Sequence, residues 1–259
     1  VLGWGSNVLP SDDGLPGLVI LNLAKRIVVR PDGFVEVETG CAFQDLFLAT
    51  VQKGLKGFEF AVGIPGTVGG AIVSNAGAYR SNVSEFLTEL EVVEGGERRW
   101  VTPDWMQFQY RDSRLRQPDA TPCAVVRLRF QLPQGDPKAS YDEAREYQRQ
   151  RIGKQPPQAS AGSFFKNVNS HELAERMENL TPGMRKAGVV PAGFLIEKVG
   201  LKGFRIGGAS FARRHANFIL NDRGATATDI RSVAFHAQTV VREQLGVEIE
   251  EEVLYLGDW

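Results

Sequence analysis

The chain has 259 residues, enough for one large domain or two modest ones, and its 42% hydrophobic and 24% charged residues exclude a disordered protein. Its 30 basic and 31 acidic residues leave a net charge of -1, so no overall field favours nucleic acid or a membrane surface. No apolar run approaches the roughly 20 residues that span a bilayer, and Cys41 and Cys123 suggest no disulfide framework. We therefore expect a soluble protein of a reducing compartment, which binds any anionic ligand with backbone amides and a few cations.

The first third of the chain is rich in glycine and in short β-branched runs. These runs predict strands at 18–20, 27–29 and 34–37. Residues 42–53 carry apolar side chains at helical spacing, and Gly54 follows as a stop signal. This region is therefore predicted to combine short strands with one helix.

The next elements predict antiparallel sheet. Residues 89–94 and 98–101 flank Gly95-Gly96 and predict a hairpin. Alternating apolar and polar side chains over 126–132 predict a half-buried antiparallel strand. Residues 133–137 are rich in proline and glycine, and they are the best candidate for a domain boundary.

Beyond residue 137 the pattern is mainly helical. A charged helix is expected over about 141–152, and a second long helix is expected from near Thr228 to Gly246. Residues 247–256 predict a closing strand. This order fits two or three α+β lobes and fits poorly the alternating βαβ units of a doubly wound sheet.

Three glycine-rich segments, at 3–7, 63–78 and 207–209, could expose successive backbone amides to a diphosphate. The alternative is that the glycines serve tight turns, and for the first segment the two explanations are about equally good. The Rossmann fingerprint needs a third glycine where Val8 stands and an acidic residue near Asn22, so that fold is disfavoured.

Arg111 lies among aromatic residues, where a partly desolvated guanidinium binds a carboxylate in a bidentate manner. The alternative for Arg111 is a surface salt bridge with Asp112. Ser163 lies between Gly162 and two phenylalanines and could donate a proton in a dry pocket, although an isolated serine is usually structural. A hydrolase is a poor fit, because the three histidines form no recognisable triad.

Glu248, Glu250 and Glu252 share one face of the predicted closing strand. Such an acidic run is usually a solvated edge, but one member could point into a site. The histidines are scattered and the carboxylates are not grouped, so we predict no metal site.

Taken in order, these segments resemble the UDP-N-acetylenolpyruvoylglucosamine reductase family. Each segment is weak evidence alone, whereas the ordered set is specific and covers nearly the whole chain. The matching segments are 3–7, 63–70, 75–79, 110–113, 162–167, 195–197, 200–203, 207–209, 215–218 and 250–253.

The resemblance implies an α+β protein with an FAD-binding fold of the vanillyl-alcohol-oxidase-like type and a smaller α+β substrate-binding domain. It implies a cytoplasmic flavoenzyme of peptidoglycan precursor synthesis, in which bound FAD and the co-substrate NADPH reduce the enolpyruvyl ether of UDP-N-acetylglucosamine to UDP-N-acetylmuramate. We expect 1–132 to bind FAD, 133–245 to bind substrate, and 246–259 to return as a strand to the active site.

The resemblance also implies the site residues. Ser163 matches the family's proton donor, and Arg111 and Glu252 match the groups that polarise the substrate carboxylate. The substrate site falls on Tyr110, Lys166, Asn167 and His215, and the flavin site on Gly3, Gly5, Ser6, Asn7, Ile64, Pro65, Gly66, Gly69, Gly70, Asn75 and Gly77.

The chain departs from the family pattern in a few places. Trp4 stands where the family usually has glycine, so its side chain must turn away from the proposed diphosphate loop. Val168 replaces a usual proline and Ala212 a usual serine. The family's first flavin-binding segment lies upstream of Val1, so we expect the sequence to be truncated at its start. The short stretch from Arg111 to Ser163 is typical of the family's shorter type, without an added loop.

Two alternatives stay open at this stage. One is a catalytically inactive relative that binds flavin or a nucleotide sugar, and the presence of Arg111, Ser163 and Glu252 argues against it. The other is a flavin-linked oxidase with a different substrate, and the segment 163–167 argues against that.

Overall fold

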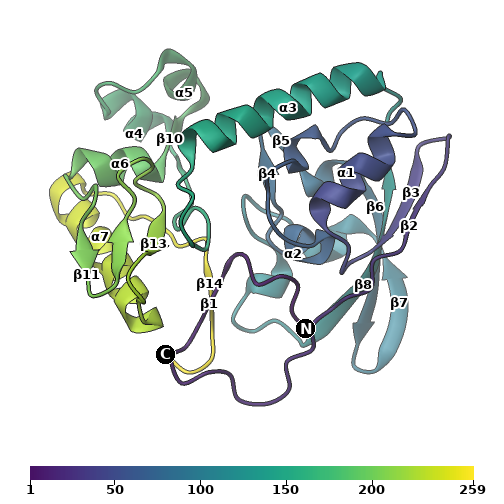
Figure 1. The fold of residues 1–259 in the computed structure, drawn as a ribbon, viewed down its shortest axis with the longest axis horizontal. Helices are drawn as coiled ribbons and strands as arrows, with labels where there is room; N and C mark the ends of the chain where they lie inside the picture. Colours follow the sequence, from purple (N-terminus) through teal and green to yellow (C-terminus); the bar gives the residue numbers. More distant parts are fainter. The chain divides into compact units, whose positions relative to one another are not determined.

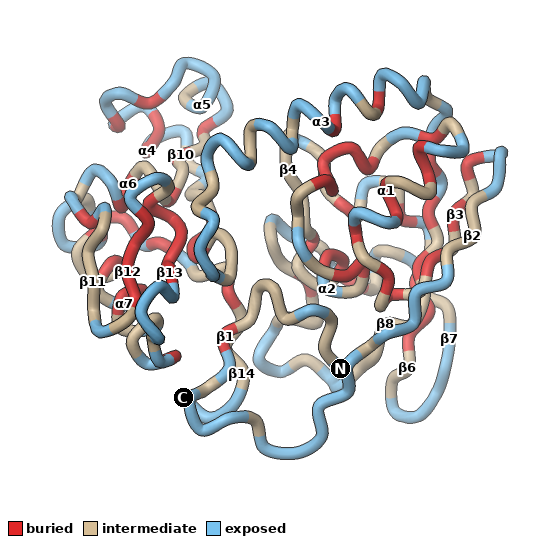
Figure 2. Tube along the Cα trace, in the orientation of Figure 1, coloured by how far each residue is buried: buried red, intermediate tan, exposed pale blue.

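The computed structural model describes all 259 residues, which form two compact units of mixed helix and sheet. The first unit comprises Val1–Gly5 and Leu18–Gly153, and the second comprises Ser6–Gly17 and Lys154–Trp259. Each unit has a hydrophobic core of its own, and the buried stretches in Figure 2 gather around α1 and α2 in one unit and around β12 and β13 in the other.

The first unit is built on a five-stranded antiparallel sheet in the order β2-β3-β8-β6-β7 (Figure 1). The predicted alternation is confirmed, because Leu128 and Phe130 are buried in the core while Arg127 and Arg129 lie on the opposite face. The hairpin at Gly95-Gly96 is confirmed as well. The strands are β2 (Ile27–Val29), β3 (Phe34–Glu38), β6 (Leu87–Glu94), β7 (Glu97–Val101) and β8 (Cys123–Gln131).

Helices and aromatic rings fill the core side of this sheet. Phe58 is the centre of the aromatic group, with its ring edge-on to Phe130 at 5.1 Å between centroids and to Phe43 at 6.0 Å. The helical elements of this unit are α1 (Phe43–Val51), η1 (Glu59–Ala61), α2 (Val68–Val73), η2 (Val83–Phe86), η3 (Pro103–Met106), η4 (Arg114–Arg116) and α3 (Pro137–Lys154), and a short hairpin joins β4 (Gly77–Ala78) to β5 (Ser81–Asn82).

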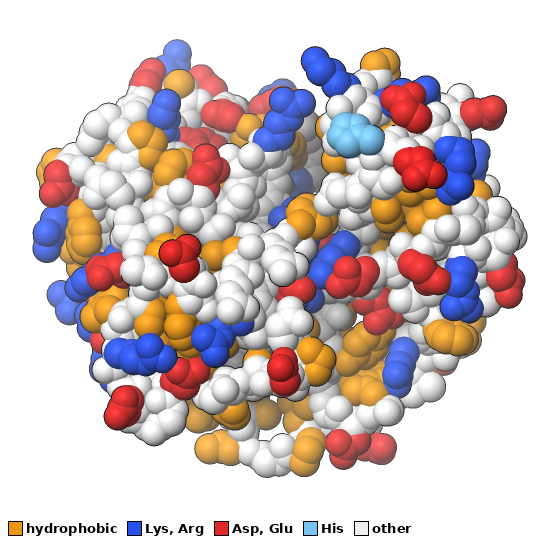
Figure 3. Space-filling view, turned by 180° about the vertical axis from the view of Figure 1, so that it is seen from behind, with side chains coloured by type: hydrophobic (Ala, Val, Ile, Leu, Met, Phe, Trp, Pro, Cys, Tyr) orange, Lys and Arg blue, Asp and Glu red, His pale blue; other side chains and the backbone are white.

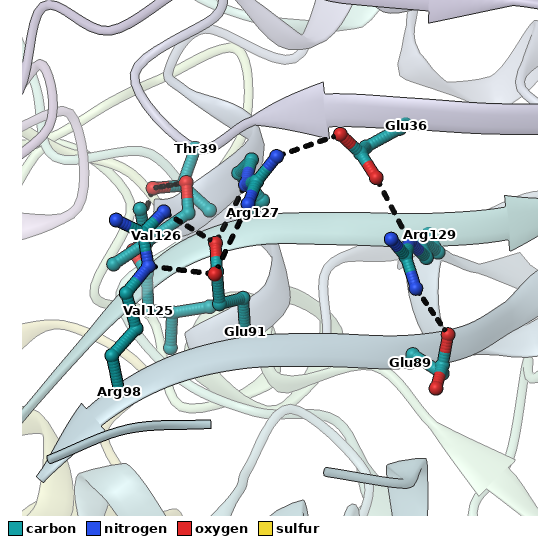
Figure 4. A network of polar contacts seen from close by, with 9 residues as sticks. All are labelled: Glu36, Thr39, Glu89, Glu91, Arg98, Val125, Val126, Arg127 and Arg129. Carbon is teal, nitrogen blue, oxygen red and sulfur yellow. Dashed lines mark hydrogen bonds and ion pairs between the residues drawn. The ribbon is translucent and has the colours of Figure 1, made fainter. Parts of the chain in front are cut away.

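A ladder of ion pairs covers the other face of the sheet (Figure 4). Glu91 accepts hydrogen bonds from Arg98 Nε at 2.6 Å and from Arg127 Nε at 2.6 Å. The ladder continues to Glu36 and to Arg129, whose guanidinium stacks on the Trp100 ring at 3.7 Å from its centroid. The Glu91 side chain is only 5% exposed, and the hydrogen bonds from Arg98 and then Arg127 lower its pKa to about 2.

We predict that the change Glu91→Gln lowers the free energy of unfolding by about 1–3 kcal/mol at pH 7, because two arginines lose a charged partner. A pKa of about 2, against an ordinary value of 4.5, means that the ionised form is favoured by folding. Its contribution is therefore present above pH 4.5 and is lost as the pH falls toward 2. Urea unfolding between pH 7 and pH 2 measures this dependence, which the variant should lack.

The matched control for this prediction is Glu89→Gln, since the Glu89 side chain is 43% exposed and pairs with Arg129 alone. Its effect should stay below about 1 kcal/mol. A Glu91→Gln protein as stable as the control, or one with the same acid dependence as the unmodified protein, would contradict the role of Glu91.

The compact units differ from the predicted domain limits at 132/133. Helix α3 packs on the first unit, where Tyr141 lies edge-on to Phe47 at 5.9 Å and Ser140 Oγ donates to Glu59 at 2.6 Å. The breaker residues 133–137 thus precede a helix that belongs to the same core. The segment Ser6–Gly17 belongs to the second unit because β1 (Val8–Pro10) pairs in parallel with β14 (Leu254–Leu256).

The second unit contains a three-stranded antiparallel sheet on which α7 (Ala227–Leu245) packs (Figure 1). The predicted long helix is confirmed; Thr226 and Asp229 form a capping box at its start, and Gly246 ends it with φ +66°. The sheet comprises β11 (Arg205–Ile206), β12 (Ala209–Phe211) and β13 (Ile219–Asn221), and the smaller elements are β9 (Val168–Asn169), α4 (His171–Arg176), α5 (Pro182–Ala187), β10 (Val189–Val190) and α6 (Ala192–Lys198).

Two predicted strands are wrong in extent. Residues 18–20 form no strand and are exposed, and only an isolated bridge joins the following Leu21 to Leu2. Of the strand predicted over 247–256, only Leu254–Leu256 is regular, because the residues before it make single backbone bonds to the 163–166 segment.

The surface drawn in Figure 3 intersperses basic and acidic side chains, as the near-zero net charge predicts. None of the helices combines the length and the apolar character that crossing a bilayer requires.

Candidate functional site

The loop that leads into α2 is shaped by packing within the first unit. The Thr67 side chain caps α2 by accepting the Gly70 N–H at 3.2 Å, and the Gly69 N–H donates to Thr39 O at 2.8 Å. A Cβ at Gly69 would lie 2.9 Å from the same Thr39 oxygen, so only glycine fits there. Gly69 and Gly70, two of the predicted flavin-site glycines, therefore fix the shape of the loop with their own amides.

The first glycine segment lies against this cap. A Cβ at Gly3 would come within 2.4 Å of Thr67 Oγ1, so the two predicted flavin loops lie side by side. The N–H groups of Gly3, Trp4 and Gly5 make no hydrogen bond within the chain, so they are available to donate to a ligand. The Trp4 side chain is 59% exposed and has turned outward, as the departure from glycine required.

Asn75, Gly77 and Arg111 come together in the same unit. Arg111 donates from Nη1 to Asn75 O at 3.3 Å and from Nη2 to Gly77 O. Asn75 Nδ2 donates to Gln109 O at 2.9 Å, whereas Asn75 Oδ1 is buried without a hydrogen-bond partner. A buried acceptor of this kind normally has a donor, so it points to a ligand that supplies one.

Backbone strain is concentrated around these residues. Non-glycine residues rarely take positive φ, and strained backbone of this kind clusters at ligand sites. Arg111 itself has φ +56°, and the Tyr110 ring lies 5.1 Å below its guanidinium. The other strained residues of this region are Asn75, Tyr79, Arg80 and Gln107.

In the second unit, Ser163 and Glu252 lie on neighbouring segments. Ser163 forms an antiparallel bridge with Phe218. The next residue, Phe164, accepts the Glu252 N–H at 2.7 Å through its carbonyl oxygen. The segment of the predicted proton donor therefore runs between the 217–218 segment and the segment of the predicted carboxyl group.

Asn217 holds this arrangement and was not predicted. Its buried side chain accepts the Phe165 N–H at 3.0 Å and donates to Phe165 O at 2.8 Å, and its carbonyl oxygen accepts the Phe164 N–H at 2.7 Å. The segment 215–218 contains this asparagine, but the sequence does not show its role, because its partners lie 52 residues away along the chain.

The predicted substrate residues in this unit have defined partners. Lys166 is buried, with Nζ 2.5 Å from Oε1 of Glu250, and Asn167 Oδ1 accepts the Ala192 N–H at 3.2 Å. Burial lowers the pKa of His215, and its Nδ1 accepts the Asn217 N–H at 3.3 Å. Both the burial and this hydrogen bond favour the neutral imidazole of His215.

The remaining predicted residues lie in different places. Tyr110 lies in the first unit and is 42% exposed. Ser6 and Asn7 belong to the second unit. Asn7 Nδ2 donates to the carbonyl oxygen of Ala161 at 2.9 Å, and Ala161 is two residues before Ser163 in the sequence. On the acidic segment Glu250 is 71% exposed, whereas burial raises the pKa of Glu251, which accepts the Tyr255 hydroxyl at 2.9 Å.

Comparison with known proteins identifies relatives along the whole chain. Residues 155–256 match the family model described as the C-terminal domain of UDP-N-acetylenolpyruvoylglucosamine reductase, and residues 1–101 match the model of an FAD binding domain. The reductase of Synechococcus sp. (strain JA-3-3Ab) is 39% identical over 100% of this chain and 77% of its own length. That of Bacillus subtilis (strain 168) is 36% identical over 99% and 79%. The crystal structure of the Thermus caldophilus reductase matches with a TM-score of 0.76 at 31% identity, over 98% of this chain and 84% of that one.

Proposed function

Since the chain belongs to the UDP-N-acetylenolpyruvoylglucosamine reductase family, we propose that Arg111, Ser163 and Glu252 divide the chemistry of its reaction between them. The chain is an FAD-containing, NADPH-dependent oxidoreductase that reduces the enolpyruvyl ether of UDP-N-acetylglucosamine to UDP-N-acetylmuramate for peptidoglycan synthesis. Its architecture is the FAD-binding fold of the vanillyl-alcohol-oxidase-like type with a smaller α+β substrate-binding domain. The catalytically inactive alternative has no support.

The first unit fits FAD. The unengaged amides of Gly3 and Gly5 belong to the segment that packs through Gly3 against Thr67, the residue after Gly66, and they can donate to a diphosphate. The buried Asn75 Oδ1 can accept a ring N–H. When bound, FAD supplies the redox chemistry by taking a hydride from NADPH and passing one to the substrate. We assign FAD binding to this unit.

Arg111 and Glu252 are assigned to the substrate carboxylate. Hydride addition places negative charge on a group that is already anionic, so the transition state needs cations or hydrogen-bond donors there. Arg111 brings a guanidinium whose backbone contacts hold it in place. Glu252 offers a second donor when it shares a proton.

Ser163 is assigned to the proton that completes the reduction. The enolate left by hydride addition is a strong base, so a weakly acidic hydroxyl can protonate it without a histidine. The observation that carries this assignment is the bonding of the Ser163 segment on one side to Asn217 and on the other to the backbone of Glu252. Lys166, Asn167, His215 and Tyr110 are left to bind the UDP-sugar.

The whole assignment is tested by absorbance. Purified protein loaded with FAD is expected to be yellow, to bleach when NADPH is added without oxygen, and to recover its oxidised spectrum when UDP-N-acetylglucosamine enolpyruvate follows. The control is the same sequence with UDP-N-acetylglucosamine, which lacks the enolpyruvyl double bond and should leave the protein bleached. Protein that stays colourless after refolding with FAD would contradict the flavin assignment.

We assign the enzyme to the cytoplasm. NADPH and nucleotide sugars are supplied there, and both are needed in every turnover. Cys41 and Cys123 are free thiols, as in proteins of a reducing compartment.

A further inference from the structure

Arg151, near the end of α3, is a cation without an acidic partner. Its Nη2 donates to Phe60 O at 3.2 Å, and it takes part in no ion pair. Its Nε is buried and has no hydrogen-bond partner. An unsatisfied donor on a desolvated guanidinium costs free energy unless something else supplies the acceptor.

The surroundings of Arg151 hold its guanidinium in one place. Gly63 has φ +78°, and a Cβ there would come within 2.9 Å of Arg151 Cδ, so the arginine stem lies directly against the start of the predicted flavin loop. On another side the Tyr79 ring lies 5.5 Å from the guanidinium carbon. The Tyr79 ring stacks on the Tyr147 ring with 3.7 Å between their centroids, and the Tyr79 hydroxyl donates a hydrogen bond to Tyr147 O. A charged group fixed in this way is preorganised for a ligand.

Arg111 is the second cation of this region. Burial lowers the pKa of Arg151, and the positive charge of Arg111 lowers it further. Arg111 directs its own donors to the backbone of Asn75 and Gly77. Two arginines that repel one another, one of them with an unused buried donor, form a site that an anion would stabilise.

A purely structural role accounts for only part of this geometry. A neutral glutamine could make the single bond to Phe60 O, and a leucine could pack against Gly63 and Tyr79. Neither contact needs a positive charge, and the charge is what makes the position costly. The unpartnered Nε beside the flavin loop is the feature that a structural role leaves unexplained.

We propose that Arg151 is an anion-binding residue of the reductase site, with Nε donating to a negatively charged oxygen of a bound ligand. The inference rests on the proposed function, which provides two sources of such an oxygen. One is the pyrimidine edge of FAD, which becomes negatively charged on reduction, and the other is the substrate, through its carboxylate or its diphosphate. Arg151 therefore adds a fourth residue to the three assigned to the chemistry.

The test compares FAD-loaded full-length Arg151→Gln with the unmodified protein by two measurements that do not depend on turnover. The first is the midpoint potential of bound FAD without substrate. The second is the dissociation constant of UDP-N-acetylglucosamine enolpyruvate, from its effect on the oxidised FAD spectrum. If the partner is the flavin, a tenfold loss of reduced-state stabilisation lowers the potential by about 30 mV. If it is the substrate, the dissociation constant rises at least tenfold and the potential stays unchanged.

Two further variants keep the test decisive. Arg149→Gln is the matched control, since Arg149 lies on the same helix with its side chain 74% exposed and paired with Glu146, and both quantities should be unchanged. Arg151→Lys keeps the charge and should restore part of whichever quantity the glutamine variant loses. In Arg151→Gln, a dissociation constant within twofold of that of the unmodified protein together with a midpoint potential shifted by less than about 10 mV would overturn the proposal. Equal losses in the glutamine and lysine variants would overturn it too. Failure of NADPH to bleach the unmodified protein would instead count against the proposed function.

Discussion

Replacing Ser163 with alanine is expected to slow the transfer of reducing equivalents to the substrate by about 10²–10⁴-fold, the range of a lost general acid. Reduction by NADPH should stay nearly normal, because no proton from Ser163 is needed in that half-reaction. Stopped-flow absorbance of bound FAD without oxygen separates the two half-reactions, with NADPH mixed first and UDP-N-acetylglucosamine enolpyruvate second.

The control for the serine variant is Ser160→Ala, an exposed hydroxyl on the same segment. It should leave both half-reactions unchanged. Equal losses in the two half-reactions of Ser163→Ala would mean that the serine supports the fold or the flavin, and the proton-donor assignment would then fail.

Replacing Arg111 with glutamine is expected to lower kcat/KM for the enolpyruvyl substrate by about 10²–10³-fold, as for the loss of one preorganised donor at a developing charge. The loss should appear with the enolpyruvyl substrate in the second half-reaction. Because Arg111 also donates to the backbone of Asn75 and Gly77, the FAD content of the variant must be measured alongside.

Arg114→Gln is the matched control for this change. The Arg114 guanidinium stacks on the Trp105 ring at 4.1 Å from its centroid and lies 3.6 Å from the Glu94 carboxylate. The glutamine variant therefore loses a cation–π contact like that of Arg111 with Tyr110, while the contacts to Asn75 and Gly77 stay in place. If Arg111→Gln retained its FAD and turned over substrate at the normal rate, the assignment of Arg111 to the carboxylate would be wrong.

The sequence predicted those elements whose cause is local. The helix that begins after Thr226 was found because its caps and its apolar spacing both lie within the segment. The strand around Leu128 was found because alternation reports one buried face. The strand predicted at 18–20 failed because apolar, β-branched residues predict a strand only where another strand is available to pair with them.

The site was predicted through the order of its motifs, and the structure added what the motifs cannot carry. Gly3 and Thr67 belong to loops that are far apart in the sequence, and only the fold shows that one packs against the other. Arg151 lies on the charged helix expected over about 141–152, where the sequence gives it no role. Its partner Phe60 lies 91 residues earlier, and no local pattern connects the two. The role of Asn217 could not be predicted for the same reason.

The path of the chain through its first residues limits how this protein can be divided. The chain enters the second unit at Ser6, returns to the first at Leu18 and leaves again at Lys154. A fragment that starts at Lys154 would lack β1, the only strand that pairs with β14. It would also lack Asp12, whose carboxylate accepts the N–H groups of Ala227 at 2.6 Å and Thr228 at 2.9 Å at the first turn of α7. A single cut between residues 153 and 154 therefore leaves the second unit incomplete, while the fragment before the cut holds every residue of the first unit and carries Ser6–Gly17 without its partners.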